Sequence, residues 1–98
     1  MTRTLLCFAL GLAGPALADD RGARCAGLGE TAAKVMEARQ LSIPEGQLLA
    51  LASDGPAVGE LTWVVREAYE EPVYGPEWQK QAAMAEFARL IEASCLAG

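Results

Sequence analysis

Apolar residues along most of this chain recur at steps of three and four, the spacing of one face of an α-helix. In residues 25–40 this stripe contains Cys25, Leu28, Ala32, Val35, Met36 and Arg39. Gly27 and Gly29 are expected to weaken the first turn of the helix. Strand-like residues are few, and only Trp63-Val64-Val65 resembles a short buried strand. The pattern predicts an all-α fold whose first helix spans about residues 25–40.

A second, short helix is bounded by helix-starting and helix-stopping residues. Ser42 and Glu45 have the spacing of a capping box, and Pro44 is tolerated in a first helical turn. The helix is expected to end near Ala52, before the turn residues 53–55. Its apolar face would contain Leu48, Leu49, Leu51 and Ala52.

A third helix is predicted to start at Pro56, with Asp54 or Gly55 as its cap, and to stop before Pro72. Its stripe contains Val58, Leu61, Thr62, Val65, Ala68 and Tyr69. Residues 70–75 contain a proline and a glycine and predict a turn.

The fourth helix opens at Pro76 and carries Glu77 in its first turn, where the helix dipole favours an anion. Its stripe contains Trp78, Met84, Phe87, Ala88, Ile91 and Cys95. The last three residues are expected to fray.

The first eighteen residues have the pattern of a cleavable secretory signal peptide. Arg3 precedes an apolar stretch, and Ala16-Leu17-Ala18 gives small residues at a cleavage site followed by Asp19. The apolar stretch is about a dozen residues, whereas a membrane span needs about twenty. We therefore expect export to the periplasm or beyond, with residues 1–18 as leader and 19–98 as one helical domain.

The three cysteines become two when the leader, which contains Cys7, is removed. An even pair in an exported chain predicts a disulfide, here between Cys25 and Cys95. In the chain-entropy view, closing a loop of this length stabilises the fold by about 4 kcal/mol. The bridge would set the first and fourth helices antiparallel, with the two middle helices covering their apolar face, as a compact four-helix bundle.

The charge of the chain disfavours several kinds of partner. Removing the leader from 98 residues leaves 80, with 13 acidic and 7 basic residues and a net charge of −6. Nucleic acids and anionic membranes require clustered Lys and Arg, so neither is expected as a partner after cleavage. The sequence has no histidine, which excludes Ser-His and Cys-His catalysis and histidine metal sites.

Candidate chemical groups are few. Glu70 and Glu71 are adjacent at a helix end and most simply form a solvated surface. Arg39 lies on the apolar stripe, where it could extend its head to solvent, pair with a glutamate of another helix, or bind a ligand. Gln40 is expected to be a helix cap or a surface group. No catalytic residue, metal ion or cofactor is predicted, and we expect no enzymatic activity.

Four aromatic residues surround the turn between the third and fourth helices: Trp63, Tyr69, Tyr74 and Trp78. Aromatic residues at helical spacing most often belong to the core, but Tyr74 lies in the turn and should be partly exposed. A partner-binding patch would be expected here, formed by Tyr74, Trp78 and Arg39. Glu70, Glu71 and Glu77 would give it an acidic rim that favours a basic partner.

A set of short motifs spread over the chain resembles a group of small exported proteobacterial helical proteins. The motifs are Ala33, Met36, Arg39 and Gln40, then Ala68-Tyr69 with Pro72, and Phe87-Ala88 with Cys95. The resemblance implies a secreted helical fold and no particular activity. In size, compartment and cysteine spacing, the chain also resembles the periplasmic acid-stress chaperones of the HdeA type.

These observations favour an exported, non-enzymatic protein that binds a protein partner in the cell envelope, as an accessory subunit or an inhibitor. The alternative is an acid-stress chaperone of the HdeA type. In acid, protonation of the 13 carboxylates would leave 7 positive charges, whose repulsion could loosen the domain and expose apolar surface.

Overall fold

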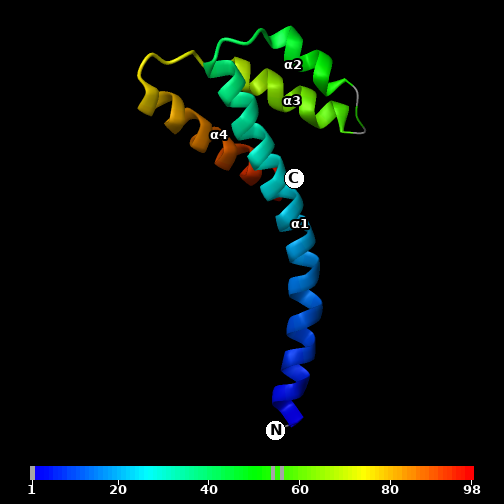
Figure 1. The fold of residues 1–98 in the computed structure, drawn as a ribbon. Helices are drawn as coiled ribbons and strands as arrows, with labels where there is room; N and C mark the ends of the chain where they lie inside the picture. The colour runs from blue at the N-terminus through cyan, green and yellow to red at the C-terminus, as the bar shows by residue number, and fades with distance from the viewer. Residues whose placement is uncertain (1, 54, 56) are drawn as a thin grey trace.

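The chain folds into four α-helices in a computed structural model that describes the backbone of residues 2–53, 55 and 57–98 and the side chains from residue 20 onward within those ranges. The helices are α1 (Thr2–Gln40), α2 (Glu45–Ala52), α3 (Val58–Tyr69) and α4 (Glu77–Ala97) (Figure 1). The described residues contain no strand, and Trp63-Val64-Val65 is part of α3. The predicted all-α class is confirmed. Asp54 and Pro56, expected to start the third helix, lie outside the described residues.

The first helix is longer than the sequence pattern predicts. α1 begins at Thr2 instead of near Cys25, so the segment predicted as a leader continues the same helix. Leu and Ala are strong helix formers and are abundant in this segment, and α1 continues through Gly14 and Pro15, which disfavour a helix interior. The N-terminal part of α1 extends away from the other three helices (Figure 1).

Helices α1 and α4 are joined by the predicted disulfide, which is confirmed. Cys25 and Cys95 are bonded, with their Cα atoms 5.5 Å apart. α4 packs antiparallel along the C-terminal part of α1 (Figure 1). Gly29 lies at a close approach of the two helices, since a Cβ atom there would be 3.0 Å from the carbonyl oxygen of Ala88. The absence of a side chain at Gly29 therefore permits this close packing.

The core is formed by three helices. Its buried side chains come from α1, α3 and α4: Ala32, Met36, Val64, Ala68, Phe87 and Ile91. α3 packs against α1, whereas α2 packs mainly against α3. The predicted cover of two middle helices over the α1–α4 pair is thus supplied by α3. In α2, Ala52 is buried, but Leu51, which was expected on the apolar face of α2, is 70% exposed.

The connection between α1 and α2 differs from the predicted capping box. Ser42 has a φ of 65°, the left-handed conformation that ends many helices, and makes no side-chain cap for α2. The amide of Ile43 donates to the carbonyl of Ala38, and the amide of Ser42 donates to that of Arg39. These two bonds form a Schellman motif, so Ser42 terminates α1 instead of starting α2.

Candidate protein-binding surface at the turn between α3 and α4

Gln40 holds the turn formed by residues 70–76. Its side chain is only 4% exposed. Its Nε2 donates to the carbonyl of Pro72 at 2.9 Å, and its Oε1 accepts from the backbone amide of Tyr74 at 2.8 Å. The expectation of a cap or surface group was wrong because Gln40 follows Met36 by four residues and therefore lies on the buried stripe. That spacing was the signal for its burial.

The backbone carbonyl of Gln40 binds the start of α4. Lys80 Nζ donates to this carbonyl at 3.1 Å. The C-terminal carbonyls of a helix have no partner within the helix and favour a cation, so the ammonium group satisfies one of them. Gln40 thus connects the end of α1 to the turn and to the start of α4.

Arg39 makes internal contacts on the neighbouring side of the turn. Its Nε donates to the carbonyl of Glu71 at 2.8 Å, and its guanidinium carbon lies 5.1 Å from the centre of the Tyr69 ring. Both contacts position the guanidinium, the second as a cation–π interaction. The structure therefore gives Arg39 a role in fixing the turn, with a backbone carbonyl as its partner instead of the glutamate carboxylate that the sequence suggested.

Tyr69 links α3 to the segment that follows α1. Its hydroxyl donates to the carbonyl of Ile43 at 2.6 Å. Burial raises the pKa of Tyr69 above its ordinary value; the nearby charge of Arg39 opposes this shift, and that of Glu45 adds to it. The phenol is therefore held as a neutral donor at physiological pH.

Tyr74 and Glu71 meet at the exposed side of the turn. The Tyr74 hydroxyl lies 3.4 Å from Glu71 Oε2. Burial raises the pKa of Tyr74, and the negative charge of Glu71, its hydrogen bond and the charge of Glu86 raise it further. Glu70, also predicted for the rim, is exposed at the C-terminal cap of α3.

An open groove of about 350 Å³ begins beside this tyrosine and follows α4. Its apolar lining consists of Ala82, Ala83, Phe87 and Leu90, and its polar lining of Glu71, Tyr74, Gln79 and Glu86. Glu86 and Leu90 were missed from the sequence. Leu90 follows the buried Phe87 by three residues, so helical spacing places it on the same side of α4 as Phe87. Glu86 directly precedes Phe87, and that spacing gives no signal for a place in the groove.

The predicted aromatic cluster divides into two kinds of residue. Tyr69 is hydrogen-bonded to Ile43 and Tyr74 to Gln40, whereas Trp63 is 40% and Trp78 is 70% exposed. Two further apolar side chains are exposed at the same end of the molecule as Trp78: Leu41 directly follows Gln40, and Val73 lies between the two residues that Gln40 binds. We call Leu41, Val73 and Trp78 the turn surface.

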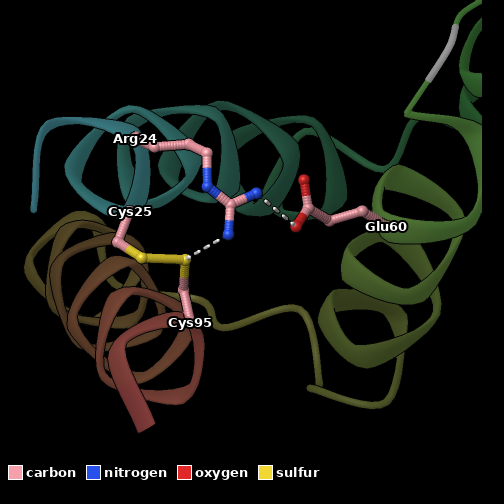
Figure 2. Close-up of polar contacts among 4 residues, drawn as sticks. All are labelled: Arg24, Cys25, Glu60 and Cys95. Carbon is pink, nitrogen blue, oxygen red and sulfur yellow. Dashed lines mark hydrogen bonds and ion pairs between the residues drawn. A yellow bond between two sulfur atoms is a disulfide. The ribbon is translucent and has the colours of Figure 1, made fainter. Parts of the chain in front are cut away.

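A second polar cluster lies at the other end of the α1–α4 pair. The guanidinium of Arg24 lies between Glu60 of α3, at 3.8 Å, and the Sγ atom of Cys95, at 3.9 Å (Figure 2). The Arg24 side chain is largely and that of Glu60 partly open to solvent, so the ion pair contributes little to stability. It connects the disulfide to α3.

Within the described ranges, no group of three or more potential ligands is arranged to hold a metal ion. Among the same residues, no helix has both the length and the apolar character required to cross a membrane. The sequence matches no protein-family model, and no curated protein or solved structure shows significant similarity to it.

Proposed function

We propose that this chain is an exported, non-enzymatic protein that binds a protein partner of the cell envelope through the turn surface. The observation that carries the proposal is a 70% exposed Trp78 next to a turn that is fixed by partly buried hydrogen bonds. The partner would carry an apolar contact area with basic residues at its edge, because the mature chain is acidic.

The turn surface has two properties of a binding site. Exposed tryptophan is among the residues that contribute most to binding energy at protein interfaces. The turn is also held in one conformation by Gln40 and Arg39, so little conformational entropy is lost when a partner binds. An isolated exposed leucine needs no such explanation, but three large apolar side chains at one end of a small domain do.

The export and the absence of catalysis in this proposal are supported by the sequence and the disulfide. The first eighteen residues have the features of a leader, and disulfides persist in oxidising compartments. The chain lacks histidine, and its third cysteine lies in the predicted leader. Binding requires neither histidine nor a free thiol, whereas Ser-His and Cys-His catalysis require histidine.

A crosslinking experiment tests the proposal. A photoreactive amino acid is placed at Trp78 in the exported chain, and at Leu51 as a control with the same exposed fraction on α2. We expect one saturable envelope protein to be crosslinked from position 78 and not from position 51. The Trp78→Ala variant should lose at least 90% of this partner in a competition assay. Equal crosslinking from both positions, or none from position 78, would contradict the proposal.

A further inference from the structure

We infer that the groove along α4 receives a lysine or arginine side chain of the partner protein, held between the carboxylates of Glu71 and Glu86. This inference rests on the proposed function and specifies the chemistry of the partner. It concerns the groove, whereas the turn surface supplies the apolar contact.

Two carboxylates line the groove. Glu71 comes from the turn and Glu86 from α4, and both line the same groove as Tyr74. The Tyr74 hydroxyl lies 3.4 Å from Glu71 Oε2. Glu71 and Glu86 are both exposed, so a cation that entered the groove would be attracted by both negative charges.

The protein supplies no such cation to these carboxylates within the described ranges. Among the described residues, the ion pair whose nitrogen and oxygen atoms lie within 4.0 Å of each other is formed by Arg24 and Glu60. It lies at the opposite end of the α1–α4 pair from the turn. Lys80 donates to the carbonyl of Gln40, and Arg39 donates to the carbonyl of Glu71. These two basic side chains thus bind backbone oxygens, and within the described ranges no ion pair involves the carboxylate of Glu71 or Glu86.

The remaining lining fits the stem of a long basic side chain. Lysine and arginine place their methylene groups along apolar surface while the charged head contacts polar groups. Phe87 and Leu90 provide this apolar surface, and Leu90 is 59% exposed. The ring of Tyr74, whose hydroxyl contacts Glu71, offers an aromatic face near the charged head. One groove therefore combines an apolar floor with an acidic end.

Peptide selection tests this inference with defined probes. Random 12-residue peptides displayed on phage are selected on the disulfide-bonded mature protein, and the recovered peptides are synthesised and titrated. We expect the peptides to combine a Lys or Arg with apolar residues. Their affinity should fall at least tenfold for the Glu71→Gln/Glu86→Gln variant, and raising the salt concentration should weaken binding to the native protein.

The matched control is the Glu70→Gln/Glu77→Gln variant. It removes the same number of negative charges beside the same turn, from residues that do not line the groove. We expect its affinity for the peptides to stay within twofold of the native value. Glu86→Gln alone, which removes no hydrogen bond present in the structure, guards against misfolding of the double variant and should lower the affinity severalfold.

The possible outcomes distinguish failure of the groove inference from failure of the proposed function. If the selected peptides depend on Trp78 but show no basic residues, or lose equal affinity in both double variants, the inference is wrong and the proposed function stands. If argininamide alone binds as tightly as the peptides, the groove is a site for a free cation, and the inference is also wrong. If neither peptides nor an envelope protein bind in a Trp78-dependent way, the proposed function fails too.

Discussion

The side-chain oxygen of Gln40 accepts the backbone amide of Tyr74 at 2.8 Å, across 34 positions of sequence. Nε2 of the same Gln40 side chain donates to the carbonyl of Pro72, so a single side chain replaces the secondary-structure bonds that the turn lacks. Because a buried amide that loses its partner is costly, this pair is expected to determine the conformation of the whole turn.

Replacing Gln40 should therefore destabilise the domain. Gln40→Ala leaves the amide of Tyr74 and the carbonyl of Pro72 without their partner and creates a cavity, so we expect a loss of about 2 to 3 kcal/mol in the free energy of unfolding. Urea denaturation of the oxidised protein measures it. Gln47→Ala, at an exposed position of α2, is the control and should change stability by less than about 0.5 kcal/mol.

Two neighbouring glycines should respond to alanine in opposite directions. Gly27→Ala has open space and should stabilise α1 by about 0.5 to 1 kcal/mol through helix propensity. Gly29→Ala brings a methyl group within 3.0 Å of the carbonyl of Ala88 and within 3.3 Å of the Cβ of Glu92. Separation of α1 and α4 should outweigh the propensity gain and lower stability by about 1 kcal/mol or more. Thermal denaturation of both variants decides; a stabilised Gly29→Ala would contradict the close packing.

The glycine pair illustrates what the sequence could and could not predict. Helical periodicity placed most of the core correctly, including Met36, Phe87 and Ile91, and cysteine parity gave the disulfide. Periodicity treats all glycines as weak points, because the approach of a distant backbone is not encoded locally. The same limit applies to Ser42, whose left-handed conformation depends on how α1 ends.

The candidate site was predicted less well, for a related reason. The turn and its two glutamates were found from composition, but the groove depends on Glu86, which α4 brings to Tyr74. Trp78 shares the stripe of Phe87, yet it is exposed because the first turn of α4 lies beyond the core residues of that helix. Contacts between helices, and not the pattern within one helix, decide which members of a stripe are buried.

The disulfide should contribute much of the stability. Cys25→Ser/Cys95→Ser, or reduction of the native chain, should lower the free energy of unfolding by about 4 kcal/mol in the chain-entropy view. Unfolding with and without a reductant measures it, and the reductant should leave the double variant unchanged.

The intact mass of the exported protein should match a chain that begins at Asp19 and is two hydrogens lighter than the reduced chain. Two free thiols in that species would contradict the assignment.

High pH should weaken the fold through Tyr69. Its pKa is raised in the folded state, so the neutral phenol is favoured there and the stabilisation is complete below the unfolded value of about 10. It is lost as the pH rises from there through the folded pKa. Urea titrations at several pH values above and below this point should show the decline, and Tyr69→Phe should flatten it. A decline of the same size in Tyr69→Phe would assign the effect to other groups.

Strong acid distinguishes partner binding from the chaperone alternative. At about pH 2 the mature chain would carry 7 positive charges and few negative ones, and repulsion should loosen its packing. Our proposal expects no protection of other proteins in this state. Two measurements test it: light scattering of an acid-sensitive client protein, and binding of an apolar dye to this chain. Suppressed aggregation of the client together with increased dye binding would favour the chaperone.

The α1–α4 pair is closed at both ends, covalently by Cys25 and Cys95 and non-covalently where Lys80 reaches the last carbonyl of α1. At 1.5 Å per helical residue, the two closures are about 22 Å apart. Reduction of the disulfide would let α1 and α4 separate first at the end farthest from the turn. In the proposed function, partner recognition at the turn surface would thus be insulated from the redox state of its surroundings, because a chain that has lost its disulfide still presents the turn surface while it remains folded.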